Sequence, residues 1–346
     1  MRKIQLKHLS LVISLLIFLS CEDQQTLEIK QRDWTIDTDY LRYGCSSGKD
    51  CIPSLQHPNK SDVDGDNLEF LNNNELVVGI WNGSEYIAYP HAILDWHEIV
   101  NENGYTISYC PLTGSALHIE SSGEFGVSGM LFNTNLIMYD RETESHWPQM
   151  LLKSAEGTRQ GNKLILNSMI ETKWSTWKNL FPNSKVVNSQ TGHSRDYNVY
   201  PYGGYRSCNS SSCGDYIYFP VPPVDTRLPA KTRVLSIITD NIQIAYPISQ
   251  FVEPTVLNET IDGKTVAIVL SADDWLGVAF ETSSTLSISQ WDSETGNIVL
   301  EDMSGNQFNI LGRSINSTTD DLVGARSFIS YWFSQAAFYP DTEIHS

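Results

Sequence analysis

Segments from the first half of this chain recur in the same order in the second half, and this repetition constrains the fold more than any other feature. ELVVGIWNGSEYIAYPHAIL (75–94) aligns with TRVLSIITDNIQIAYPISQF (232–251), and both contain Ile-Ala-Tyr-Pro. Three further pairs follow along the chain: 103–120 with 262–281, 139–147 with 291–299, and 174–187 with 329–345. Matches that keep their order predict two copies of one structural unit, which we expect to pack with pseudo-two-fold symmetry.

Short apolar runs alternate with Asn, Gly, Asp and Ser turns in both copies. Two such runs flank Asn82-Gly83, a strong signal for a β-hairpin. Similar runs are YTISYC, LIMYD, NKLIL, RVLSIIT, IQIAYP, TVAIVL and NIVLED. Helical periodicity is limited to HAILDWHEIV, WSTWKNLF and SFISYWFSQAAFY, of which the last is the longest. The predicted class is mainly β with a few short helices (α+β), built as an internally duplicated β unit.

The N-terminus has the features of an export signal. MRKIQLKHLSLVISLLIFLSC starts with basic residues, continues with an apolar run from Leu9 to Leu19, and ends in Ser20-Cys21. The run is short for a membrane-spanning helix. A cysteine after a small residue at this place resembles a bacterial lipoprotein cleavage site, where Cys21 would carry the lipid. We therefore expect a protein of the bacterial cell envelope, lipid-anchored on the periplasmic face or the cell surface. An uncleaved anchor or an ordinary export signal is the alternative.

Local composition divides the chain into five parts. They are a lipoprotein signal peptide (1–20), a polar tether and entry segment (21–45), a first β repeat with a candidate site (46–194), a Tyr- and Pro-rich connector (195–230), and a second β repeat (231–346). Each repeat is long enough to bury a core of its own.

The net charge restricts the possible partners. The chain has 23 Lys and Arg residues against 41 Asp and Glu residues, a formal charge of −18. Nucleic acids and anionic lipid surfaces need a basic face, so the charge argues against both. The partners we expect are the membrane, through a lipid on Cys21, and an unidentified small-molecule or protein ligand.

The cysteines suggest disulfides in an oxidising compartment. Cys45 and Cys51 share one Gly/Ser-rich loop, and Cys208 and Cys213 share another. Each pair could close its own loop, or the two loops could be cross-linked. Both schemes leave Cys110 unpaired, either as a free thiol of functional interest or as a buried, inert residue.

His97 and Cys110 are candidate site residues because only the first copy contains them. The alignment places Pro254 opposite His97 and Val269 opposite Cys110. Chemistry confined to one copy is what we expect of a site built onto one half of a duplicated scaffold.

Three interpretations of these residues stay open. Cys110 could be a nucleophile activated by His97, with Glu98 orienting the imidazole, as in a thiol-dependent enzyme. Cys110 and His97 could instead bind copper or zinc, which favour thiolate and imidazole ligands. Both could also be packed residues of the core, without any chemistry.

A weaker candidate for a metal site is the segment SDVDGDN. Asp62, Asp64 and Asp66 alternate around a glycine, as carboxylates do in calcium-binding loops. The closing glutamate of an EF-hand loop is absent, and a solvated turn is the alternative.

The connector is rich in tyrosine. Tyr200, Tyr202 and Tyr205 surround Pro and Gly residues in YPYGGY and could form a stacking platform for a carbohydrate or an aromatic small molecule. A tyrosine-rich packed linker between the two halves is the alternative.

Long motifs along the chain carry a family resemblance. They are AYPHAILDWHEIVN, YCPLTGSA, FGVSGMLFNTNLIMYDRETESHW, RDYNVYPYGGY and YWFSQAAFYPDTEI. On these motifs the chain resembles the bacterial and archaeal family called domain of unknown function 3179, from about Ile52 to Ile344. The family has no established activity, so the resemblance implies no reaction.

The resemblance does imply a pattern at the turn after Cys110. Family members typically have Tyr-Cys-Pro-x-Cys-Gly where this chain has YCPLTG (109–114). Cys110 matches the first cysteine and Thr113 stands at the second, which removes dithiol chemistry within the turn. A metal site using both thiolates would also lose a ligand. His97 and Glu98 match the Trp-His-Glu of the family.

We interpret the sequence as an envelope lipoprotein with a Cys/His site in the first repeat, either metal-binding or thiol-dependent. The alternatives are a non-catalytic protein that binds a carbohydrate or an aromatic small molecule, and a structural lipoprotein. The sequence leaves open whether the protein is an enzyme.

Overall fold

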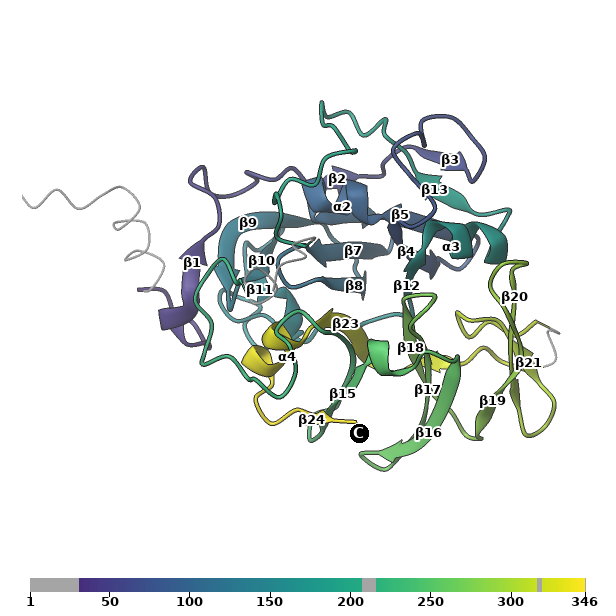
Figure 1. Cartoon of the computed structure of the whole chain (residues 1–346). Helices are drawn as coiled ribbons and strands as arrows, with labels where there is room; N and C mark the ends of the chain where they lie inside the picture. Colours follow the sequence, from purple (N-terminus) through teal and green to yellow (C-terminus); the bar gives the residue numbers. More distant parts are fainter. Residues whose placement is uncertain (1–30, 207–215, 316–318, 346) are drawn as a thin grey trace, which may run out of the picture.

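The computed structural model describes residues 31–206, 216–315 and 319–345 (Figure 1). Cys21, Cys208 and Cys213 lie outside the described residues. Among the residues that the structure describes, no helix is long and apolar enough to cross a membrane.

The described residues before the connector form thirteen strands. They are β1 (Leu41–Tyr43), β2 (Leu55–Gln56), β3 (Lys60–Asp62), β4 (Leu76–Trp81), β5 (Tyr86–Pro90), β6 (Ile99–Glu102), β7 (Tyr105–Cys110), β8 (Ser115–Glu120), β9 (Phe125–Phe132), β10 (Asn135–Asp140), β11 (His146–Pro148), β12 (Ile170–Lys173) and β13 (Lys185–Val187). These strands make three sheets, in the orders β12-β4-β5-β13-β3, β2-β6-β7-β8 and β1-β9-β10-β11.

The part of the chain after the connector that the structure describes forms eleven more strands. They are β14 (Arg233–Ile238), β15 (Gln243–Pro247), β16 (Thr255–Ile261), β17 (Lys264–Ser271), β18 (Leu276–Glu281), β19 (Leu286–Asp292), β20 (Asn297–Asp302), β21 (Gln307–Phe308), β22 (Val323–Gly324), β23 (Ser327–Tyr331) and β24 (Glu343–Ile344). Their sheets have the orders β23-β14-β15-β24, β16-β17-β18-β22 and β19-β20-β21.

In residues 31–206, 216–315 and 319–345 helical structure is limited to short segments, so the predicted class, mainly β with a few short helices, is confirmed. The α-helices are α2 (His91–His97), α3 (Trp174–Leu180) and α4 (Trp332–Phe338), and the 3-10 turns are η1 (Thr38–Tyr40), η2 (Gln149–Leu151) and η3 (Ile248–Gln250). The hairpin predicted around Asn82-Gly83 is also confirmed, as β4 and β5 pair antiparallel.

Two local predictions were wrong. SFISYWFSQAAFY is not one long helix, because its first five residues form strand β23, whose backbone pairs with β14. NKLIL (162–166) does not form a strand of a sheet. It makes only isolated bridges, at Lys163 and Leu166, and Ile165 between them is 59 % exposed.

One sheet in each half has the same connectivity. The β4–β5 hairpin gains β12 as an antiparallel neighbour of β4 and β13 as a parallel neighbour of β5. The β14–β15 hairpin gains β23 and β24 in the same way. In both sheets a helix connects the two added strands, α3 in the first and α4 in the second. This correspondence fits the predicted internal duplication, which stays a prediction.

Two large buried clusters span both halves, and the sheets of the halves pack against each other in Figure 1. One buried cluster joins Leu117 of β8 to Phe328 of β23, and another joins Trp177 of α3 to Phe280 of β18. The backbone N–H of Tyr331 also donates to the carbonyl of Thr113, at 2.8 Å. Because burial of apolar side chains drives packing, these shared clusters hold the halves together as one unit.

Candidate functional site

Helix α2 ends at the residues that the sequence analysis singled out. His97 is its last residue, and Glu98 follows with a left-handed backbone (φ 55°). The N–H of Glu98 donates to the carbonyl of Leu94 and closes the helix. Left-handed residues at helix ends are usually Gly or Asn, so contacts of the glutamate side chain must compensate for this conformation.

Four consecutive residues at this helix end hold the connector. Each uses a side-chain contact: Asp95 with Arg206 (3.1 Å), Trp96 Nε1 with the carbonyl of Val199 (3.0 Å), His97 Nε2 with Tyr197 Oη (2.8 Å), and Glu98 Oε1 with Tyr202 Oη (2.7 Å). The segment DWHE therefore binds the connector, which lies about a hundred residues away in sequence.

His97 is fully buried, and both of its ring nitrogens have partners. Nδ1 lies 2.8 Å from the carbonyl oxygen of Pro53. Because a carbonyl oxygen only accepts, Nδ1 carries the proton and Nε2 accepts from Tyr197. Burial lowers the pKa of His97 to about 4, so the ring is neutral at pH 7. The lone pair that a metal ion or a general base would use is already engaged.

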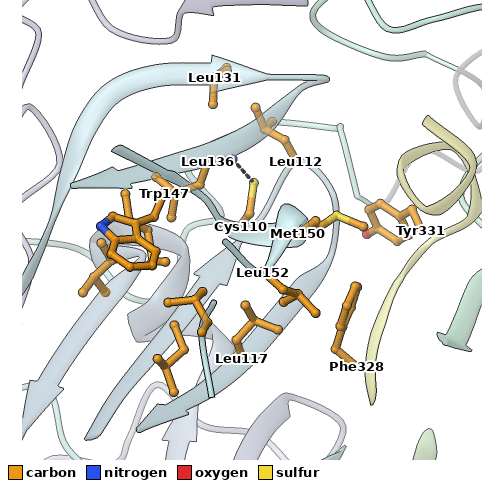
Figure 2. Packing of buried hydrophobic residues seen from close by; sticks show 14 of the residues in the cluster. Cys110, Leu112, Leu117, Leu131, Leu136, Trp147, Met150, Leu152, Phe328 and Tyr331 are labelled. Carbon is orange, nitrogen blue, oxygen red and sulfur yellow. Dashed lines mark hydrogen bonds between the residues drawn. The ribbon is translucent and has the colours of Figure 1, made fainter. Parts of the chain in front are cut away.

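Cys110 is the last residue of β7 and lies inside a hydrophobic cluster (Figure 2). It is 1 % exposed, and its sulfur accepts a hydrogen bond from the N–H of Leu136 at 3.4 Å. Its other partner is the carbonyl of Thr134, so the structure does not join Cys110 to His97. Burial raises the pKa of the thiol to about 11, which leaves little thiolate at neutral pH.

Thr113, in the turn that follows Cys110, belongs to a buried polar network. Its hydroxyl lies 2.9 Å from Ser115 Oγ and 2.9 Å from Asn135 Nδ2. Gln149 completes the network by accepting from Ser115 at 2.6 Å and from Asn135 at 2.8 Å. Because buried polar groups need partners, these bonds fix the turn between β7 and β8.

The register of the two hairpins corrects the sequence alignment at Cys110. In β7–β8, Cys110 pairs with Ser115, and in β17–β18, Ser271 pairs with Leu276. The same number of residues connects the strands in both hairpins, so Ser271 corresponds to Cys110. The alignment of Cys110 with Val269 was therefore wrong by two residues.

Glu98 is a buried carboxyl group with one hydrogen-bond donor, the hydroxyl of Tyr202. Burial raises the pKa of Glu98 to about 7, and the nearby Asp95 acts in the same direction. Within the described residues Glu98 forms no ion pair, since Arg206 binds Asp95. Near neutral pH this carboxyl group is therefore partly ionised without a positive partner.

Glu98 and Tyr202 line a pocket of about 230 Å³ with mostly apolar walls. The other lining residues are Gly44, Cys45 and Ile52, Leu112 of the β7–β8 turn, Val127, Gly129, Met130 and Leu131 of β9, Leu136 of β10, and Tyr218 and Phe219 of the connector. Cys110 does not line the pocket itself, but it packs in the same cluster as Leu112 and Leu136, which do (Figure 2).

A disulfide closes the loop at the edge of this pocket. Cys45 pairs with Cys51, which is one of the pairings that the sequence left open. Asp50 fixes the loop to β10 and the residue that follows it by accepting from the hydroxyl of Tyr139 at 2.6 Å and from Arg141 at 2.8 Å. Ile52 is thereby held in place beside the pocket.

The predicted metal ligands are not brought together. Among the described residues, no group of three or more His, Cys, Asp or Glu side chains could hold a metal ion. Asp62 pairs with Lys185 at 2.7 Å, while Asp64 and Asp66 are exposed to solvent. The sets proposed for copper or zinc at His97 and Cys110, and for calcium at Asp62, Asp64 and Asp66, are therefore not assembled.

The tyrosines of the connector pack with one another rather than forming an open platform. Tyr205 is buried, donates to the carbonyl of Leu112 at 2.8 Å, and stacks on Tyr218. Tyr200 lies under the guanidinium of Arg206, 4.3 Å from its ring centre. Of the three tyrosines proposed for ligand binding, Tyr202 is the one that lines the pocket.

A second buried group of charged residues, which was not predicted from the sequence, lies between the halves. Glu171 pairs with Arg233 at 3.0 Å, and Nε2 of His91 lies 3.0 Å from the same carboxylate without a hydrogen bond. Burial lowers the pKa of His91 and raises that of Asp95 to about 7. One signal was present: His91 and Asp95 are polar and four residues apart, on one face of a mostly apolar helix.

Comparison with known proteins identifies a family but no activity. No curated protein and no solved structure matches the chain. A family model described as "Protein of unknown function (DUF3179)" matches residues 49–342, which is most of the chain. The chain belongs to the DUF3179 family.

Proposed function

We propose that this protein binds a small, mostly apolar molecule in the pocket beside Glu98. The observation that carries the proposal is a buried carboxyl group without a counter-charge on the wall of an otherwise apolar pocket. Ligand sites typically combine apolar walls with a few convergent polar groups. Glu98 would orient the ligand, and the leucines of the pocket would contact its apolar part.

The volume of the pocket limits the ligand. Its 230 Å³ is below the range of about 300–1,000 Å³ that is typical for drug-sized ligands. A molecule with one six-membered ring and a short polar arm matches this size. A larger ligand would have to extend past Tyr218, which is 42 % exposed at the edge of the connector.

The thiol-dependent and metal-binding alternatives have less support. A catalytic thiol needs a low pKa and a base within reach, whereas the pKa of Cys110 is raised and His97 is engaged by Pro53 and Tyr197. We infer that Cys110 supports the pocket wall and that His97 anchors the connector.

A pocket-filling variant tests the proposal. Ile52 is half-buried at the pocket, and Ile52→Trp places a large ring there, whereas Ile165→Trp adds the same ring at an exposed site. Saturation-transfer NMR with benzylamine and benzyl alcohol measures binding. We expect a Kd of about 1 mM or tighter for at least one probe, as for a good fragment of this size.

In Ile52→Trp we expect affinity to fall at least tenfold, and in Ile165→Trp to stay within twofold. The thermal unfolding midpoint of each variant shows whether the fold is intact. Absence of binding of both probes to the wild-type protein, or equal binding to Ile52→Trp, would contradict the proposal.

We also propose that a lipid on Cys21 anchors the protein in the bacterial cell envelope. The basic and apolar N-terminal sequence supports this, and the Cys45–Cys51 disulfide fits an oxidising compartment. Metabolic labelling with a radioactive fatty acid should mark the wild-type protein and not Cys21→Ala. Equal labelling of both would refute the anchor at Cys21.

A further inference from the structure

The groups around Glu98 indicate the charge of the ligand. Tyr202 uses Oε1 of the carboxylate, and no described residue donates a hydrogen bond to Oε2. Within the described ranges, the charged or ionisable neighbours that act on Glu98 or are affected by its charge are Asp95, Tyr202 and Cys110, none of which is a cation. A buried carboxylate is unfavourable unless it gains a partner. No described residue gives the Glu98 carboxylate a positively charged one.

Aromatic rings are the second feature of the pocket that bears on the charge of the ligand. Tyr202, Tyr218 and Phe219 line it together with the carboxyl group. The faces of aromatic rings carry negative charge and attract ammonium ions, and the attraction is stronger where water is excluded. An anionic ligand would be repelled by Glu98 and by the net charge of −18.

Building on the proposed function, we propose that the pocket binds a small organic ammonium ion. Its N–H group would donate to the free Oε2 of Glu98, and its apolar body would lie against Leu112, Leu131 and Leu136. A carboxylate beside several aromatic rings supplies both interactions that such an ion needs, whereas a neutral alcohol would gain the hydrogen bond alone.

This ligand class predicts a specific pH dependence. The ammonium ion needs Glu98 ionised, and burial raises the pKa of Glu98 to about 7 in the free protein. Affinity should therefore fall about tenfold for each pH unit below 7, or about a hundredfold between pH 8 and pH 5. Asp95, whose pKa is also about 7, changes charge in the same range but faces Arg206.

Benzylamine and benzyl alcohol form a matched pair of probes for the full-length protein. They differ by an ammonium group in place of a hydroxyl. At pH 8 we expect benzylamine to bind at least tenfold more tightly, as a charge-assisted hydrogen bond exceeds a neutral one. In Glu98→Gln, whose amide oxygen still accepts from Tyr202, the preference and the pH dependence should disappear while benzyl alcohol still binds.

The outcomes separate the two proposals. If benzyl alcohol binds to the wild-type protein as tightly as benzylamine, or if the affinity for benzylamine does not fall between pH 8 and pH 5, the ammonium inference is wrong and the binding function stands. If neither probe binds, both are wrong. Should Glu98→Gln fail to fold, the pH dependence of the wild-type protein decides.

Discussion

His97, Glu98 and Cys110 carry different roles although they appear as one group in the sequence. His97 is neutral and bound at both nitrogens, Glu98 is a partly ionised acid, and Cys110 is a core residue. The sequence could indicate that these residues matter, because polar side chains in apolar segments need partners. It could not assign their roles, since Pro53, Tyr197 and Tyr202 come from distant parts of the chain.

At the scale of single residues we predict that the thiol of Cys110 is protected from reagents. Burial raises the pKa of Cys110 from 9.0 to about 11, so at pH 8 the thiolate fraction is about a hundredfold below that of an ordinary cysteine. Alkylation of Cys110 by iodoacetamide, followed by mass spectrometry of its peptide, should be at least a hundredfold slower in the folded protein than in guanidinium chloride. Comparable rates in the two states would restore the thiol-dependent interpretation.

At the scale of elements, short-range patterns predicted the class and several individual strands and helices. The β4–β5 hairpin and the helices α2 and α3 lie where turn residues and apolar periodicity placed them. The structure of SFISY could not be predicted from its residues, because its aromatic side chains suit either a helix or a strand. Pairing with β14 makes it a strand. Pairing also revealed that Ser271, and not Val269, corresponds to Cys110.

The reason for that alignment error lies in strand length. Strand β17 has eight residues and β7 has six, whereas the alignment matches the two-residue turns that precede them, at 103 and 262. A longer hairpin shifts every residue after it relative to the first copy. Sequence matching cannot detect this shift where one copy has Cys-Pro-Leu-Thr and the other Ser-Ala-Asp-Asp.

At the scale of the whole molecule, the pocket depends on segments that meet only in the folded chain. The disulfide loop, the end of α2, the β9–β10 hairpin and the connector all contribute to its wall. The contacts of residues 95–98 with the connector bring Tyr202 to Glu98. A single sequence contains no signal for such long-range contacts, which is why Tyr202 was expected only as part of a ring platform.

We propose above all that Glu98 is a buried carboxyl group that binds the cationic group of a ligand. The pKa of this carboxyl group tests the proposal most directly. A ¹³C NMR titration can follow the Glu98 carboxyl carbon, with Glu98→Gln identifying its resonance. We predict a pKa near 7 in the free protein, a decrease of at least two units with saturating benzylamine because a cation stabilises the ionised form, and no decrease with benzyl alcohol. A pKa near 4.5 in the free protein, or one that benzylamine leaves unchanged, would contradict the account.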